Sequence, residues 1–140
     1  MKLIIGKKID MVQYFDDQGK TSAATFVGAP PEDLSKGDRV SVSGISKGKG
    51  FQGVVKRHKF KGGSRTHGQK HSEREPGAIG GGGRAGGRVA RGMRMAGRMG
   101  GDRITVKNLK VLEVDKDNNQ ILISGAVPGR RGTLLEIRSK

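Results

Sequence analysis

The sequence contains no cysteine, no tryptophan and few aromatic residues of any kind, with four phenylalanines and one tyrosine among 140 residues. Without cysteine the chain can form no disulfide framework, no reactive thiolate and no thiolate metal site, which fits a reducing compartment. Long apolar runs are missing too. The apolar residues 3–5 are too few for a signal-peptide core or a membrane span. We therefore expect a cytoplasmic protein with no membrane partner.

Acidic residues are scarce as well, with 13 Asp and Glu against 28 Lys and Arg, so the formal net charge is +15 and the pI is about 10.7. An excess of this size predicts a polyanionic partner. The charge is concentrated in residues 46–103, which hold 15 of the Lys and Arg but only three acids. This segment carries +12, and the other 82 residues together carry +3.

Residues 46–103 also contain 17 of the 25 glycines and all three histidines, but few large apolar side chains. Such a segment buries too little apolar surface to offset its ordering entropy, so we expect a folded nucleic acid to order it. Phe51, Val54 and Val55 are spaced for one or two turns of helix with an apolar face, which we expect to dock on the mouth of a β-barrel formed by the rest of the chain. Between Arg88 and Arg98 an arginine recurs every three or four residues, which suits either a basic helical stripe or an extended strand in a groove.

The rest of the chain shows short β-prone runs separated by turns. Residues 16–19 and 115–119 are strong turn signals. Two prolines at positions 30 and 31 cannot join a strand ladder, and a helical turn is expected at 32–34. The predicted strands cover residues 3–5, 11–15, 21–27, 39–43, 104–106, 109–114, 120–124 and 134–137. Without βα alternation, these strands predict a mainly β fold. We expect a small antiparallel β-barrel of residues 1–45 and 104–140, with 46–103 inserted as a long basic Gly/Arg-rich loop.

The alternation of cations with glycines predicts RNA binding by this loop. Arginine makes bidentate phosphate contacts, and glycine lets the backbone approach a phosphate closely. Only Phe51 and Phe60 could stack on bases, so we expect recognition of RNA shape rather than an aromatic platform. A solvated charged loop is the alternative. The candidate RNA-binding residues are Lys47, Lys49, Lys56, Arg57, His58, Lys59, Lys61, Arg65, His67, Lys70, His71, Arg74, Arg84, Arg88, Arg91, Arg94, Arg98 and Arg103.

Two GxGxxG matches, at residues 48–53 and 81–86, raise the possibility of a nucleotide-binding enzyme. A dinucleotide fold needs βαβ units around such a motif, and this chain has none. Chance matches are expected in a glycine-rich chain. We therefore predict no cofactor and no small-molecule substrate.

The remaining polar clusters lack the pattern of a metal or catalytic site. His67 and His71 lie four residues apart, with His58 and Glu73 nearby, but no cysteine supports the spacing and the surroundings are cationic. Glu73 and Glu75 are expected to form ion pairs with neighbouring basic residues. Asp16 and Asp17 are expected to stabilise a turn through hydrogen bonds to its backbone. We predict no metal site, no catalytic residue and no enzymatic activity.

Several motifs resemble the bacterial type of the L-three family of large-subunit ribosomal proteins. They follow the family's order and cover most of the chain. The matching stretches are residues 5–11 (IGKKIDM), 44–58 (GISKGKGFQGVVKRH), 66–68 (THG), 74–80 (REPGAIG), 95–100 (MAGRMG) and 125–129 (GAVPG).

The resemblance implies a β-barrel on the ribosome surface, with a long loop that enters large-subunit rRNA of the 23S type. It also implies a role early in subunit assembly, neighbouring large-subunit proteins, and a loop tip near the peptidyl transferase centre. By position the tip would comprise Gly80, Gly81, Gly82, Gly83 and Arg84.

Two departures from the family stand out. Residues 27–43 are shorter than in most relatives, and glycines replace a glutamine that can be methylated at the tip. A free-standing nucleic-acid chaperone remains the main alternative function.

Overall fold

The chain folds into two compact units. The computed structural model describes residues 2–30, 34–81 and 86–139. The first unit, called the sheet unit, comprises Met1–Lys47 and Gly101–Lys140. The second, called the glycine-rich unit, comprises Gly48–Gly100. Within the described ranges, no helix combines the length and the apolar character needed to cross a membrane.

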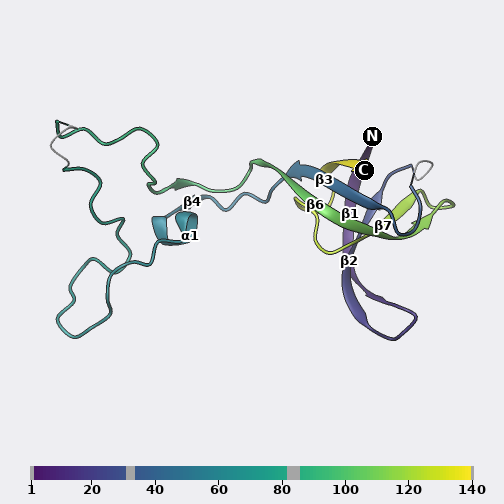
Figure 1. Ribbon diagram of the computed structural model, residues 1–140, viewed down its shortest axis with the longest axis horizontal. Helices are drawn as coiled ribbons and strands as arrows, with labels where there is room; N and C mark the ends of the chain where they lie inside the picture. Colours follow the sequence, from purple (N-terminus) through teal and green to yellow (C-terminus); the bar gives the residue numbers. More distant parts are fainter. Residues whose placement is uncertain (1, 31–33, 82–85, 140) are drawn as a thin grey trace. The chain divides into compact units, whose positions relative to one another are not determined.

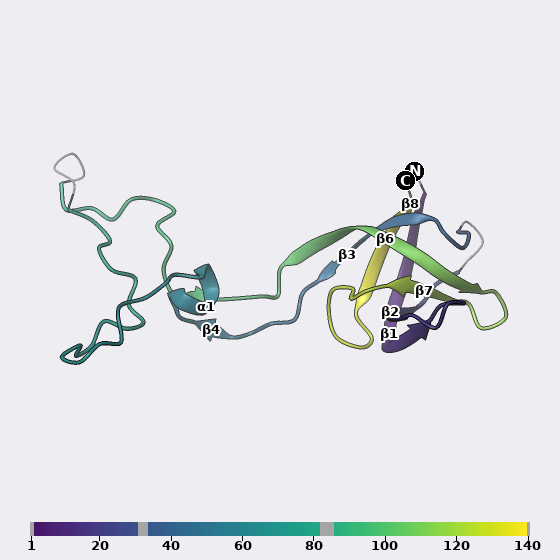
Figure 2. The same cartoon turned by 60° about the horizontal axis from the view of Figure 1, so that its bottom comes forward.

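Six strands form the sheet unit, and every neighbouring pair is antiparallel. The pairing order β1-β2-β7-β6-β3-β8 returns to β1, so the sheet is closed (Figure 1). Figure 2 shows β8 running beside β1, with which it pairs. The mainly β, antiparallel prediction is therefore confirmed. The strands are β1 (Leu3–Phe15), β2 (Thr21–Gly28), β3 (Arg39–Ile45), β6 (Arg103–Asp115), β7 (Gln120–Ser124) and β8 (Leu134–Ser139).

Alternation along these strands separates an inner apolar face from an outer polar one, as a pleat of period two requires. In β8, for example, Leu135 and Ile137 are buried while Leu134 and Arg138 are exposed. The core consists of Ile4, Val27, Ala29, Leu34, Val40, Val42, Val111, Ile121, Ile123, Val127, Leu135 and Ile137. Full burial of each larger side chain contributes about 1.5–3 kcal/mol, so this small core carries the stability of the unit.

The first strand is longer than predicted. Gly6, Lys7 and Lys8 were expected to interrupt it, but β1 runs without a break from Leu3 to Phe15, with a register shift against β2 between Lys8 and Asp10. Gly6 faces the interior, where a Cβ would lie 2.8 Å from both Ala29 Cβ and Val27 Cγ1. Glycine is therefore required here by close packing and does not end the strand.

Strand β6 likewise joins two predicted runs, 104–106 and 109–114, into one strand, Arg103–Asp115. Asn108 lies between them with φ +59°. The pairing of β3 with β6 shifts register nearby, between Val40 and Val42, as at a β-bulge. The strand thus absorbs an irregular residue instead of stopping.

The predicted turn at residues 115–119 is confirmed. One Asp115 carboxylate oxygen accepts hydrogen bonds from the Asp117 and Asn118 backbone N–H groups, and the other accepts from the Asn118 side chain. The side-chain bond from Asn118, followed by its backbone bond, lowers the pKa of Asp115. Most of the predicted helical turn at 32–34 lies outside the described residues.

A buried lysine fixes the loop between β7 and β8. Lys8 is 7% exposed, and its Nζ donates to the carbonyl oxygens of Val127 (2.8 Å) and Gly129 (3.1 Å). Its backbone N–H donates to the Thr133 carbonyl, and its own carbonyl accepts from the Gly132 N–H. Burial, and then the positive charge of Lys47, lower the pKa of Lys8, while Asp10 acts in the opposite direction.

Replacing Lys8 with methionine is expected to lower the free energy of unfolding by about 1–3 kcal/mol, because two carbonyl groups lose their donor. Lys7→Met is the matched control, since Lys7 is exposed on the same strand. Because folding lowers the pKa of Lys8, the folded protein releases this proton before the unfolded chain does. The stability of the parent protein relative to the variant therefore increases as the pH rises towards 10.5, the ordinary pKa. Urea denaturation at several pH values measures both effects, and a constant difference would contradict the linkage.

Candidate nucleic-acid interface

The two ends of the glycine-rich unit meet in a small antiparallel sheet of β4 (Phe51–Gln52) and β5 (Gly97–Arg98). Hydrogen bonds from the Lys49 N–H to the Met99 carbonyl (2.8 Å) and from the Met99 N–H to the Gly50 carbonyl (3.0 Å) extend this pairing. Residues 53–96 therefore form a long excursion that starts and ends at the paired strands β4 and β5. The alternatives of a basic helix or one extended strand for residues 88–98 are both wrong. The described backbone there is mainly turns and irregular segments that end in β5.

The predicted helix is present as α1 (Val54–His58), but its apolar face differs from the prediction. Val54 is buried, whereas Phe51 lies in β4 and is 73% exposed. Gly53 is the N-cap residue of α1 and has an extended backbone, so the helix begins at Val54 and does not include Phe51. At the other end Lys59 adopts a left-handed conformation, with φ +60°, and its N–H donates to the Val54 carbonyl. The spacing pattern identified the helix but could not show where it begins.

Two of the predicted RNA-binding residues also hold the unit together. Arg57 Nη1 donates to the Met95 carbonyl oxygen (2.8 Å), and His58 Nε2 lies 2.9 Å from the same oxygen. A Cβ on Gly97 would lie 2.7 Å from Arg57 Nη1. Arg57 thus fixes the backbone beside it and keeps further N–H groups for an anion.

A close backbone crossing shapes residues 62–73. The Gly63 N–H donates to the Glu73 carbonyl (3.1 Å), and a Cβ on Gly63 would lie 2.7 Å from the Ser72 carbonyl oxygen. Gly62 has φ +75°, and a Cβ there would clash with the Glu73 carbonyl oxygen. Only glycine fits both positions.

An ion pair closes the same crossing. Arg65 Nε lies 3.2 Å from Glu73 Oε2, which confirms the predicted pairing of Glu73 with a basic neighbour. The two side chains are 76% and 45% exposed, so the pair contributes only about 0–1 kcal/mol.

Most of the candidate RNA-binding side chains are exposed, which leaves them accessible to a ligand. Arg57 and His58 are half-buried. Gly80 and Gly81 of the predicted tip are exposed, whereas Gly82, Gly83 and Arg84 lie outside the described residues. The exposed candidates are Lys47, Lys49, Lys56, Lys59, Lys61, Arg65, His67, Lys70, His71, Arg74, Arg88, Arg91, Arg94, Arg98 and Arg103.

Few of these cations are neutralised within the protein. In residues 48–81 and 86–100, the pair of Arg65 with Glu73 is the only ion pair that the structure shows. The unit therefore presents a strongly positive surface, which attracts a polyanion over long range. The described residues also bring together no group of three His, Asp or Glu side chains that could hold a metal ion.

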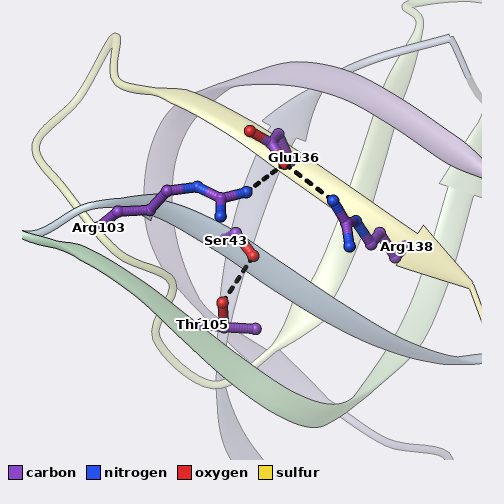
Figure 3. A network of polar contacts seen from close by, with 5 residues as sticks. All are labelled: Ser43, Arg103, Thr105, Glu136 and Arg138. Atoms are coloured by element: carbon purple, nitrogen blue, oxygen red, sulfur yellow. Dashed lines mark hydrogen bonds and ion pairs between the residues drawn. The ribbon is translucent and has the colours of Figure 1, made fainter.

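Sequence reasoning named Arg103 as a candidate but missed the basic cluster that it forms with Lys107 and Arg138 on the outer face of the sheet unit. Arg103 on β6 and Arg138 on β8 both contact Glu136 Oε2, the latter at 3.6 Å (Figure 3). Beside them Ser43 on β3 and Thr105 on β6 form a hydroxyl–hydroxyl hydrogen bond of 2.8 Å. The period-two spacing of Arg103, Thr105 and Lys107 in the sequence was the available signal, since alternate strand residues share a face.

A positively charged, glycine-rich unit joined to a closed antiparallel sheet defines a class of small, basic β proteins. The family model described as Ribosomal protein L3 matches residues 24–121. The chain belongs to the ribosomal protein L3 family.

Similar proteins include the large ribosomal subunit protein uL3 of Chlorobium limicola, 54% identical over 108 residues, covering 77% of this chain and 51% of the relative. That of Herpetosiphon aurantiacus is 52% identical over 101 residues, covering 72% and 47%. The protein uL3c of Guillardia theta is 51% identical over 117 residues, covering 81% and 56%. The chain thus spans about half the length of the relatives it matches.

Proposed function

We propose that this protein is a structural constituent of the large ribosomal subunit and binds large-subunit rRNA. The observation that carries the proposal is the exposed, largely unpaired set of cations in the glycine-rich unit. Phosphate contacts from Lys and Arg supply most of the affinity of such an interface. Membership of the ribosomal protein L3 family supports the same conclusion. The protein acts by binding and is not an enzyme.

The two parts of the chain have different roles in this proposal. Residues 1–45 and 104–140 form a β-barrel that anchors the protein at the subunit surface. Residues 46–103 form the loop that penetrates the rRNA, with residues 80–84 directed towards the peptidyl transferase centre. By filling space between RNA helices, the loop supports early subunit assembly. The paired strands β4 and β5 support this arrangement, because they return the segment to where it began.

Neighbouring large-subunit proteins are the second class of partner. Exposed apolar residues on the sheet unit support this part of the proposal. Leu3, Ile5 and Leu134 are 55%, 61% and 61% exposed on the paired strands β1 and β8. Grouped exposed apolar side chains are typical of protein interaction sites.

The test is co-sedimentation of the tagged full chain with large subunits, together with filter binding of the purified protein to large-subunit rRNA. We expect retention on the subunit in high salt. About ten phosphate contacts predict a slope of log K against log salt of roughly −7 to −9. A free-standing nucleic-acid chaperone would be removed by the salt wash, and a slope near zero would contradict phosphate-dominated binding altogether.

A further inference from the structure

A groove of about 300 Å³ lies on the outer face of the sheet unit. Strands β3, β6 and β8 form its walls. Its lining includes the cations Arg103, Lys107 and Arg138 and the hydroxyl groups of Ser41 and Thr105. Arg103, Thr105, Ser41 and Arg138 are paired in the sheet, which fixes their positions, and Lys107 lies in the register shift of β6 beside Asn108.

The strand register brings these residues together. Ser43 pairs with Glu136 on one side and with Thr105 on the other, and Ser41 pairs with Arg138. Because alternate residues of a strand share a face, the partners of Ser43 and Ser41 form adjacent rows on the outer surface. Directly opposite residues lie about 5 Å apart, close enough for side chains on three strands to meet one ligand.

Glu136 acts as a fixed support for the two arginines. Figure 3 shows Arg103 and Arg138 reaching towards it from opposite sides, and both contact the same carboxylate oxygen. A guanidinium has five N–H donors, so each arginine keeps several for another acceptor. With three cations and one carboxylate, the groove retains an excess of two positive charges.

The length of the groove favours a linear polyanion over a single carboxylate. Arg103 and Lys107 are four residues apart on β6, which places their Cα atoms about 13 Å apart at about 3.3 Å per residue. Successive charges along one backbone can meet cations spread over that length. Hydroxyl donors between the cations suit phosphate oxygens in the same way.

We propose that this groove binds consecutive backbone phosphates of an RNA strand, through Arg103, Lys107 and Arg138, with Ser41 and Thr105 as additional donors. The inference rests on the proposed rRNA binding and extends it to a second site, on the sheet unit. It implies that this unit grips the RNA backbone itself and does more than carry the glycine-rich unit.

The test is the double variant Lys107→Ala, Arg138→Ala, measured for binding to large-subunit rRNA at several salt concentrations. We expect a roughly tenfold or larger loss of affinity and a salt slope shallower by about one per cation removed. The matched control is Lys20→Ala, Lys116→Ala, which removes two exposed lysines from turns of the same unit and should leave the slope nearly unchanged. A charge-retaining variant, Lys107→Arg, Arg138→Lys, should keep the slope.

Denaturation midpoints equal to that of the parent show that the variants fold. If the alanine pair does not fold, Lys107→Gln, Arg138→Gln replaces it in the same measurement. An unchanged slope overturns the groove proposal, and a loss of subunit retention without loss of RNA affinity assigns the groove to a protein partner instead. Failure of the parent protein itself to bind rRNA would overturn the proposed function, and that result is separate from any behaviour of the variants.

Discussion

Replacing Arg88, Arg91, Arg94 and Arg98 together with alanine is expected to reduce the affinity for large-subunit rRNA by about a hundredfold to ten-thousandfold. All four side chains are exposed in the glycine-rich unit, where they add to a positive surface with little internal neutralisation. A charge-assisted contact contributes about 1.5–3 kcal/mol, although such contributions are rarely additive. Four lost phosphate contacts should also make the salt slope shallower by about 3–4.

In cells the same variant should accumulate fewer complete large subunits, because a loop that cannot neutralise phosphates leaves RNA helices to repel one another. Sucrose-gradient profiles measure that yield. The control replaces four exposed lysines of the sheet unit, Lys20, Lys36, Lys110 and Lys116, and removes the same total charge. Equal losses in both variants would show that net charge matters and the loop does not. Normal yield and affinity in the arginine variant would remove the main support for the proposed function.

Ile137→Ala is expected to cost about 2–5 kcal/mol of unfolding free energy, a large share of the about 5–15 kcal/mol that stabilises an average domain. Ile137 is fully buried and lies between β1 and β3, paired with Ile4 and Val42. The small core has few other residues to close the cavity. Urea denaturation followed by circular dichroism measures the loss.

Leu134→Ala on the same strand is the matched control. Leu134 is 61% exposed, so its truncation should change stability by no more than about 0.5 kcal/mol. Similar losses for both variants would contradict the register of β8, because a slip of one residue exchanges its inner and outer faces.

Much of the sheet unit could be predicted because turn chemistry and period-two alternation are local. Residues 120–124 matched β7 from end to end, and the Asp115 turn followed from its own side-chain hydrogen bonds. The predicted break of the strand at Gly6 was wrong, because glycine usually weakens a strand but here is required by close packing. The contacts that require it come from Val27 and Ala29, more than twenty residues away. No local pattern reports such a contact.

For the candidate site too, features within one stretch of sequence could be predicted, whereas features that depend on strand pairing could not. The basic segment was visible because its cations and glycines are concentrated in one stretch of sequence. Of the groove on the sheet unit, the sequence indicated only Arg103, since Arg103 and Glu136 are 33 residues apart and meet only through the pairing of β3 with both β6 and β8. Arg57 shows a further limit, because composition cannot reveal that an RNA-binding candidate also anchors the Met95 carbonyl.

The position of β8 has a consequence for synthesis. It joins β1 to β3, so those two strands each keep a row of unsatisfied backbone groups until residues 134–139 leave the exit tunnel. A nascent chain that already contains the first five strands of the ring therefore has two open edges, which are templates for association with other nascent chains. Of the six strands in the ring, β8 is translated last and ends this exposure, so a pause or truncation shortly before Leu134 should release an aggregation-prone intermediate.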